Sequence, residues 1–448
     1  MTYMTKTGLK LGMSAAAAIC GLCALPALAQ DESANPAQAE TVQDRAGEAD
    51  VPLIIPQPVY EPKWSADYAT DLLAFIAAID SEGLKPSDYR PEQLTAAIAA
   101  GEGAALDAEF VRAFTWLAED LRDGRTPMKA RVEWYVNDPD ADTTPISMLL
   151  AKVKESGDVA GTLRSLEPAH PDYAALRDML AKTPKAEISK RRLIMANMDR
   201  WRWLKRDLGK DYLHTNVPEY KVRYVVNKQQ IVNYRTVVGK PGRNATPQLA
   251  EMVQGVIFNP TWTVPQSIVK GEGLGARVLA NPTWARSQGY EATKGANGYV
   301  SVVQKPGPTN ALGYMKLDMP NRHAIFLHDT PSRHLFRNAD RALSHGCIRT
   351  ENAMELAMVI ALVQGDVPLD RSKQIVKSLE YTRVPVKREL PVYITYFTMA
   401  SDVDGKMTNF RDIYSRDKPV LDALAAARPQ RPEKIKLEDN VVTEERKL

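Results

Sequence analysis

One cysteine of this chain stands apart from the other two. Cys347 lies in the run Ser344-His345-Gly346-Cys347-Ile348-Arg349, whereas Cys20 and Cys23 lie in an apolar N-terminal segment. A single thiol has no disulfide partner in the rest of the chain, so nucleophilic catalysis is the best reason for its presence. His328 lies nineteen residues upstream, at the end of a predicted strand. A histidine near a cysteine can make a thiolate that reacts at neutral pH. The polar neighbours of Cys347 argue against its being a small buried core residue.

The residues beside the cysteine indicate how it could be activated. Gly346 permits a tight turn and lets the backbone approach a substrate carbonyl. A helix is predicted over residues 350–364, so its N-terminal amides and positive dipole end would point at the sulfur. Arg349 would share a face with Cys347 in extended backbone and could bind a carboxylate. His345 is too near in sequence to place its ring beside the sulfur, so we expect it to shape the loop or the oxyanion site.

A metal site is the alternative interpretation of the same region. His328, His334, His345 and Cys347 are potential ligands, spaced as H-x5-H, H-x10-H and H-x-C. These spacings lack the C-x2-C and H-x3-H pairs that are typical of zinc sites. We therefore expect no metal and no other cofactor.

The N-terminus predicts export. Lys6 and Lys10 precede a mostly apolar stretch over residues 11–28, and Ala27-Leu28-Ala29 forms a small-x-small cleavage site. This is the layout of a cleavable signal peptide over residues 1–29. An uncleaved membrane anchor is the alternative, but the apolar run is short and rich in alanine. No later stretch is apolar enough to span a bilayer, so we expect no transmembrane anchor in the mature chain.

The charge composition argues against one class of binding partner, nucleic acids. Removing residues 1–29 from the 448 takes away two of the 58 basic residues and none of the 55 acidic ones, which leaves a formal charge of +1. There is no block of lysine and arginine of the kind that follows phosphates, so we expect no nucleic-acid partner. The length predicts two or three domains, and 44% apolar residues can supply their cores.

The first half of the mature chain reads as helical. Residues 30–62 are acidic and proline-rich and predict a disordered spacer. Residues 63–216 then predict a helical scaffold domain, with apolar residues at helical spacing from Leu72 to Ile79 before Gly83. Asp107 is predicted to cap a second helix that ends at Gly124. Further helices are predicted near 145–156, 170–182 and 186–208.

The second half reads as β-rich, which makes the fold class α+β. Residues 217–425 contain β-branched runs and turn signals. Between residues 265 and 310 a Gly/Asn/Pro-rich stretch predicts a loop-rich cap insertion. Residues 426–448 predict a disordered charged tail. The expected strands are Lys221–Val226, Ile231–Val238, Met252–Phe258, His323–His328 and Pro391–Thr398.

These residues resemble a known family. His328-Asp329-Thr330-Pro331-Ser332, Leu335-Phe336, Arg341 and the run from Ser344 to Arg349 resemble the active-site signature of the L,D-transpeptidases with a YkuD-type catalytic domain. The resemblance covers roughly residues 60 to 425. The large YcbB-type branch is indicated by further segments: Arg200–Leu204, Val238–Pro241, Asn259–Pro265, Pro306–Gly313 and Asn321-Arg322.

The resemblance implies a reaction on peptidoglycan in the periplasm. Cys347 would be the nucleophile and His328 the proton donor and acceptor, with Ser344, His345, Gly346 and Arg349 as oxyanion or substrate residues. The enzyme would attack the L,D-bond of a tetrapeptide stem, release D-Ala, hold a thioester and pass the acyl group to an amine of a second stem. The insertion at 265–310 would be a mobile cap, and carbapenems would acylate the thiol. No separate peptidoglycan-binding module is found, which is a departure from many members of the branch.

Three alternatives follow from the same residues. The thioester could be resolved by water, as in an L,D-carboxypeptidase or amidase, because the acceptor depends on how well the cleft excludes water. The stem could instead be attached to a lysine of an outer-membrane protein. A non-catalytic cell-wall binding scaffold is the third alternative, but it would need neither Cys347 nor His328.

Overall fold

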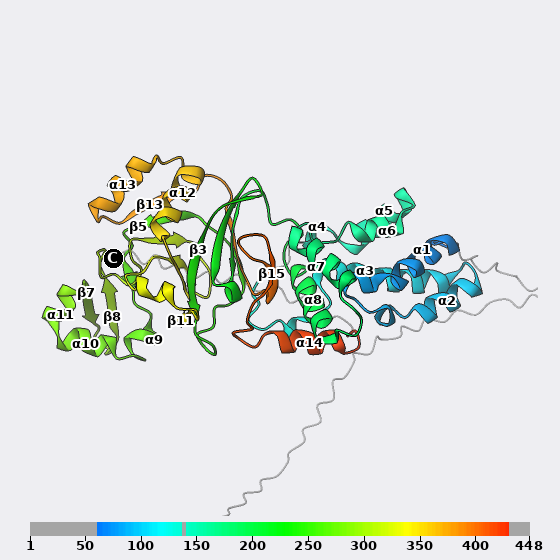
Figure 1. The fold of residues 1–448 in the computed structure, drawn as a ribbon, viewed down its shortest axis with the longest axis horizontal. Coiled ribbons are helices and arrows are strands. Elements are labelled where there is room, and N and C mark those ends of the chain that lie inside the picture. Colours follow the sequence, from blue (N-terminus) through cyan, green and yellow to red (C-terminus); the bar gives the residue numbers. More distant parts are fainter. Residues whose placement is uncertain (1–60, 137–139, 430–448) are drawn as a thin grey trace, which may run out of the picture. The chain divides into compact units, whose positions relative to one another are not determined.

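The computed structural model describes residues 61–136 and 140–429 (Figure 1). The predicted signal peptide, nearly all of the predicted spacer and nearly all of the predicted tail lie outside the described residues. Within the described ranges, no helix has the length and apolar character needed to cross a membrane. The described residues group into one compact unit, and the domain boundaries near 63, 217 and 425 stay predictions.

The N-terminal part is helical, as predicted. The helices near 72–79, 145–156 and 170–182 are confirmed, and the one predicted over 186–208 ends at Trp201. Apolar side chains from α1, α2, α3, α5 and α6 form a single core, so helical periodicity and burial agree. The helices are α1 (Ala66–Ala77), α2 (Pro91–Ala100), α3 (Ala104–Asp123), α4 (Asp140–Thr143), α5 (Ile146–Ser156), α6 (Val159–Arg164), α7 (Pro171–Lys182) and α8 (Ile188–Trp201).

Asp107 does not cap α3, contrary to the prediction. The helix begins at Ala104 after Gly103, which places Asp107 inside its first turn. The Asp107 carboxylate instead accepts hydrogen bonds from the backbone N–H groups of Lys63 and Trp64, at 2.9 and 2.8 Å for the shortest contacts. The acidic side chain therefore ties the segment before α1 onto α3.

An eleven-stranded sheet dominates the second part, in the order β13-β5-β9-β10-β12-β3-β2-β1-β14-β4, with β11 paired to β3. Its core lies under α12 (Ala353–Gly365). Two short further helices, α13 (Leu369–Ser378) and α14 (Asp417–Ala425), follow. The strands are β1 (Tyr212–Asn216), β2 (Lys221–Val226), β3 (Gln229–Gly239), β4 (Leu249–Met252), β5 (Gly255–Phe258), β9 (Met315–Asp318), β10 (Leu327–His328), β11 (Ala342–Ser344), β12 (Ile348–Thr350), β13 (Thr382–Pro385) and β14 (Pro391–Thr395).

Two strand predictions have different outcomes. The β2–β3 hairpin is confirmed, and its turn consists of Asn227 and Lys228, both at positive φ (51° and 61°), as expected of a tight two-residue hairpin turn. The strand predicted over Met252–Phe258 is instead broken after Met252. Met252 is the last residue of β4, and only Gly255–Phe258 of the predicted strand is β5; the two strands lie near opposite ends of the strand order, which a run of apolar residues cannot reveal.

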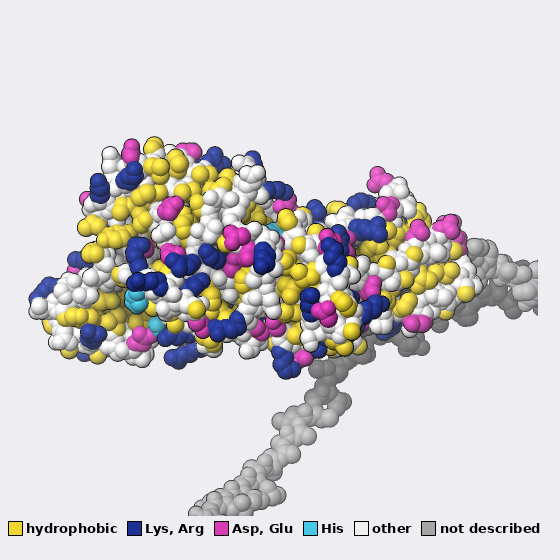
Figure 2. Space-filling model, in the orientation of Figure 1, with side chains coloured by type: hydrophobic (Ala, Val, Ile, Leu, Met, Phe, Trp, Pro, Cys, Tyr) yellow, Lys and Arg dark blue, Asp and Glu magenta, His cyan; other side chains and the backbone are white. Residues whose placement is uncertain are grey.

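Apolar side chains are exposed on the outer side of α12 and at the two ends of α13. Leu362, Leu369 and Leu379 are exposed there, and the apolar surface over these helices is visible in Figure 2. The other side of α12 packs on the sheet. The helix is thus apolar on both sides, which explains why its sequence reads as a strongly hydrophobic run.

The insertion is a folded subdomain and not a loop-rich cover. Its three strands pair in the order β6-β8-β7, and a small core contains Val264, Val269, Val278, Ala285 and Val302. Each element is too short for periodicity to detect, which is why composition alone suggested loops. The elements are β6 (Trp262–Thr263), α9 (Gln266–Val269), α10 (Leu274–Ala280), α11 (Pro282–Ser287), β7 (Tyr290–Lys294) and β8 (Val300–Gln304).

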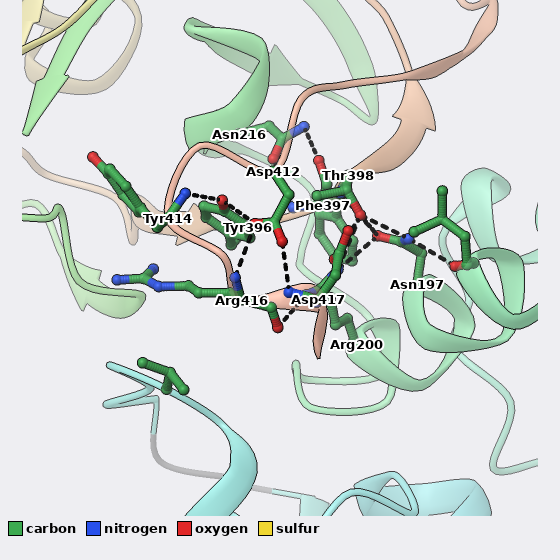
Figure 3. Close-up of polar contacts among 12 residues, drawn as sticks. Asn197, Arg200, Asn216, Tyr396, Phe397, Thr398, Asp412, Tyr414, Arg416 and Asp417 are labelled. Atoms are coloured by element: carbon green, nitrogen blue, oxygen red, sulfur yellow. Dashed lines mark hydrogen bonds and ion pairs between the residues drawn. The ribbon is translucent and has the colours of Figure 1, made fainter. Parts of the chain in front are cut away.

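Hydrogen bonds join the helical part to the sheet. Gln248 exchanges backbone hydrogen bonds with the segment after α3, receiving one from Tyr135 at 3.0 Å and donating one to Glu133 at 2.8 Å. On α8, Arg200 pairs with Asp417 at 2.7 Å and donates to the Thr398 hydroxyl at 3.1 Å (Figure 3). These contacts attach the helical part to the residue before β4 and to residues that follow β14.

Candidate active site

Cys347 lies in a turn between β11 and β12. β12 pairs in parallel with β10 and antiparallel with β3, and α12 begins only at Ala353. The prediction that a helix starts directly after the cysteine and aims its dipole at the sulfur is therefore wrong. Pairing with two neighbouring strands overrides the local helical preference of this segment.

The thiol is partly exposed and has a backbone acceptor. Sγ of Cys347 donates to the carbonyl oxygen of Ala324 at 3.6 Å, and the next amide, of Ile348, donates to Phe326 at 2.9 Å. Only Leu327–His328 of the strand predicted over residues 323–328 is regular. The residues before it form a turn, in which Ala324 has a positive φ of 51°. This turn lies directly against the sulfur.

His328 is buried and neutral. Burial and then the positive charge of Arg349 lower its pKa to about 3, with a smaller contribution from Lys316 and an opposing one from the Asp329 hydrogen bond. Nδ1 lies 2.5 Å from the backbone oxygen of Asp329, so in the neutral ring Nδ1 carries the proton and donates it. This tautomer, assigned from the hydrogen bond, leaves Nε2 as a proton acceptor.

The strand register places His328 beside Arg349, on the strand that follows the cysteine turn. In the parallel β10–β12 pair, Leu327 is opposite Ile348 and His328 is opposite Arg349. Paired residues project from the same face of a sheet, so His328 and Arg349 share a face. The side chain of Arg349 also interacts with the sulfur. Burial lowers the pKa of Arg349, and the negative charge of the Cys347 thiolate acts in the opposite direction. The register thus places a neutral imidazole and a cation on one face of the strand pair that adjoins the cysteine turn, and the cation interacts with the sulfur.

Hydrogen bonds within the turn hold its shape. The Ser344 hydroxyl donates to the carbonyl of Cys347 at 2.6 Å and accepts from the amide of Gly346 at 3.1 Å. Gly346 has φ of +124°, a region that favours glycine. Ser344 therefore supports the turn in this state, and the Gly346 amide is directed at Ser344.

His345 faces the insertion. Its Nε2 lies 2.6 Å from Oε1 of Glu272, and both side chains are about half exposed (46% and 51%). That His345 shapes the loop and is not the base stays a prediction. Glu272 was not foreseen as a site residue, because it lies in a stretch that the sequence presents only as a connection. The Ala324 carbonyl was also missed, since a backbone acceptor leaves no signal in residue types.

Two further histidines are near in sequence, and one of them, His323, belongs to the turn beside the sulfur. The ring of His323 packs against Tyr135, with ring centroids 4.0 Å apart and ring planes tilted by 40°, and His334 is exposed in a short 3-10 turn. Across the described ranges, no three His, Cys, Asp or Glu side chains group in a way that could hold a metal ion. That no metal is needed stays a prediction.

Two family models match the chain. Residues 210–385 match the L,D-transpeptidase catalytic domain named YkuD, and residues 57–180 match a model described as a scaffold domain. The first match contains both Cys347 and His328, and the second covers most of the helical part.

One individual protein resembles this chain over part of its length. A Haemophilus influenzae protein named as a candidate L,D-transpeptidase is 29% identical over 223 residues, which is 46% of this chain and 45% of that protein. The chain thus spans less than half the length of this relative.

Two solved structures give more distant matches. An L,D-transpeptidase from Mycobacterium smegmatis is 11% identical, with a TM-score of 0.22 over 42% of this chain and 58% of that one. L,D-transpeptidase 1 from Mycobacterium tuberculosis is also 11% identical, with a TM-score of 0.20 over 42% and 61%. Residues 210–385 of this chain therefore match the YkuD L,D-transpeptidase catalytic domain, and part of the chain is similar to the Haemophilus protein.

Proposed function

We propose that this protein is an exported peptidoglycan L,D-transpeptidase of the large YcbB-type branch, which works in the periplasm and uses Cys347 as its nucleophile. The observation that carries the proposal is the neutral, buried His328 on the strand beside the cysteine, with Nδ1 bound to Asp329 and Nε2 able to accept a proton. A base in that state can take the thiol proton at neutral pH, which thioester chemistry requires.

The acylation step follows from this arrangement. Nε2 of His328 takes the proton of the Cys347 thiol while the sulfur attacks the carbonyl carbon of the third stem residue. The oxyanion that forms is stabilised by backbone amides of the turn. The carbon–nitrogen bond to D-Ala then breaks, and the departing amine takes the proton from His328. A thioester on Cys347 and free D-Ala result.

The second step regenerates the enzyme. The amine of a second stem attacks the thioester carbonyl, and His328 accepts the proton that the amine loses. The carbon–sulfur bond breaks, and the sulfur takes a proton back as the new amide forms. Arg349 is suited to bind a stem carboxylate, because it is a partly buried cation on the same face as His328.

The acceptor determines which reaction is observed. Water would make the protein an L,D-carboxypeptidase or amidase, and a lysine of an outer-membrane protein would make it an attachment enzyme. The insertion supports the transpeptidase, because Glu272 connects it to His345, two residues from the nucleophile. A cover beside the thioester limits hydrolysis.

Purified protein incubated with disaccharide-tetrapeptides tests the proposal by mass spectrometry. We expect cross-linked dimers that have lost one D-Ala. Cys347→Ala should form none, and His334→Ala, a change at an exposed histidine outside the site, should match the wild type. Tripeptides alone would indicate trimming by water, and products only with an added lysine-bearing acceptor protein would indicate attachment. Dimers formed by Cys347→Ala would contradict the assigned nucleophile.

A further inference from the structure

A buried threonine that is distant in sequence forms a hydrogen bond with the cysteine turn. Thr246 follows β3 in sequence and is fully buried. Its hydroxyl donates to the carbonyl oxygen of Gly346 at 2.8 Å and accepts from the amide of Gly239 at 2.8 Å. One hydroxyl therefore joins the end of β3 to the residue directly before the nucleophile.

The bound carbonyl belongs to the same peptide group as the Cys347 amide. In a planar trans peptide the C=O and the next N–H point in opposite directions. Anchoring the Gly346 carbonyl therefore determines where the Cys347 N–H points. The glycine itself restrains this plane weakly, because it has no side chain and adopts positive φ readily (here +124°). The restraint must come from a neighbour, and Thr246 supplies it.

Thr246 is itself held on both sides of its backbone. Its amide donates to the Tyr414 hydroxyl at 3.3 Å, and that hydroxyl donates to the carbonyl of Gly239 at 2.5 Å. Its carbonyl accepts from the buried guanidinium of Arg416 at 3.2 Å. Tyr414 and Arg416 belong to the polar cluster of Figure 3. In that cluster the Tyr414 amide donates to the Tyr396 hydroxyl at 2.7 Å.

The close approach at Gly239 confirms how tightly this segment packs. A Cβ at Gly239 would collide with the carbonyl oxygen of Asn244 and would lie 2.8 Å from the amide of Thr246. The glycine is therefore required for the loop of Thr246 to lie against β3. The threonine hydroxyl can then reach the Gly346 carbonyl.

We propose that Thr246 is a positioning residue that aims the Cys347 N–H at the oxyanion of the acylation step. The inference rests on the proposed thioester chemistry. It assigns the orientation of one oxyanion donor to a residue outside the active-site signature around His328 and Cys347. Thr246 touches neither substrate nor sulfur in this assignment. It acts through the peptide group between Gly346 and Cys347.

The test compares two reactions of the same sulfur. Acylation by a tetrapeptide or a carbapenem builds an oxyanion, whereas alkylation by iodoacetamide does not. Thr246→Val keeps the shape and removes the hydroxyl. Loss of one oxyanion donor slows catalysis about 10²–10³-fold, so a misaimed donor should slow acylation by about 10–100-fold. Alkylation should stay within about twofold of the wild type, and Thr246→Ser should restore acylation.

Thr395→Val is the matched control. Thr395 is a buried threonine of the same sheet, and its hydroxyl lies 2.8 Å from Nε2 of His214, away from the cysteine turn. This variant should lose comparable stability without changing the ratio of acylation to alkylation. If Thr246→Val does not fold, Tyr414→Phe gives the answer, because it removes the hydroxyl that holds both Thr246 and Gly239.

Three results would overturn the inference: acylation at the wild-type rate in Thr246→Val, an equal loss of acylation and alkylation, or the same changed ratio in Thr395→Val. If Tyr414→Phe is used instead, a ratio of acylation to alkylation equal to that of the wild type would also overturn the inference. A wild-type protein that is alkylated but never acylated would instead refute the proposed function, and the inference would fall with it.

Discussion

Lowering the pH from 7 to 4.5 should leave the rate of Cys347 acylation almost unchanged. The reason is that His328, the proposed base, is buried beside Arg349 and has its pKa lowered to about 3. The acid limb of a plot of acylation rate against pH reports the pKa of the essential base in the free enzyme. We therefore expect the acid limb to lie at a pH well below the range in which an ordinary histidine titrates.

The size of the effect follows from the two pKa values. At pH 4.5 a histidine with a pKa of about 3 is about 97% neutral, whereas one at the ordinary value of about 6.5 is about 1% neutral. At pH 4.5 the acylation rate expected with the lowered pKa of His328 is thus about 100-fold higher than the rate expected with an ordinary histidine as the base. Removing the charge of Arg349, as in Arg349→Gln, should raise the pKa of His328 and move the limb to higher pH.

Protein stability has to be followed in the same experiment. A histidine kept neutral in the fold binds its proton only in the unfolded chain between pH 6.5 and about 3, so stability falls as the pH falls through that window. At 1.36 kcal/mol per pH unit, His328 would account for a loss of about 2.7 kcal/mol at pH 4.5. Circular dichroism at each pH would show the range in which the protein remains folded.

Stopped-flow acylation by a carbapenem, from pH 8 down to the lowest pH at which the protein remains folded, provides the assay. A wild-type rate that falls tenfold per unit below pH 6.5, while the protein stays folded, would refute the reasoning. So would a limb that does not move in Arg349→Gln. Because the position of the limb is measured and not the absolute rate, a weaker affinity of the variant for the carbapenem does not disturb the comparison.

Three further predictions concern the site and its cover. His328→Ala should lose about 10²–10⁴-fold in acylation rate, the usual worth of a general base. His345→Ala should lose less, because its ring binds Glu272, and equal losses would reverse the two roles. Glu272→Gln weakens the contact between the insertion and the cysteine turn, so it should speed hydrogen exchange in residues 265–310 of the free enzyme and raise the share of hydrolysed product. Mass spectrometry measures both quantities. Unchanged hydrogen exchange would count against that contact. EDTA should leave cross-linking unchanged, and a loss of activity that zinc restores would establish the metal site that we do not expect.

Residue types alone pointed to the reactive pair. Cys347 and His328 were selected because thiol and imidazole have few other uses in such surroundings, and the structure places them on neighbouring segments. Helical periodicity likewise predicted α1, α5 and α7. In these cases the deciding information is local: side-chain chemistry, or the position of apolar residues within one or two turns.

Other features depended on contacts between distant parts of the chain. The segment after Cys347 is a strand because β10 and β3 pair with it on both sides. The run from Met252 to Phe258 is not one strand, because Met252 ends β4, which pairs with β14, and Gly255–Phe258 forms β5, which pairs with β13 and β9. The insertion folds around a core shared by several short elements, none of which is periodic enough to recognise alone.

The chemistry of the site shows the same division. The sequence by itself determined which side chains could react, because reactivity begins with the residue type. Only the tertiary structure decided that His328 is neutral, because burial and the charge of Arg349 lower its pKa. Only the tertiary structure placed Thr246 on the carbonyl of Gly346, one hundred residues away. Hydrogen bonds and desolvation depend on distances in space, and those distances are set when the whole sheet forms.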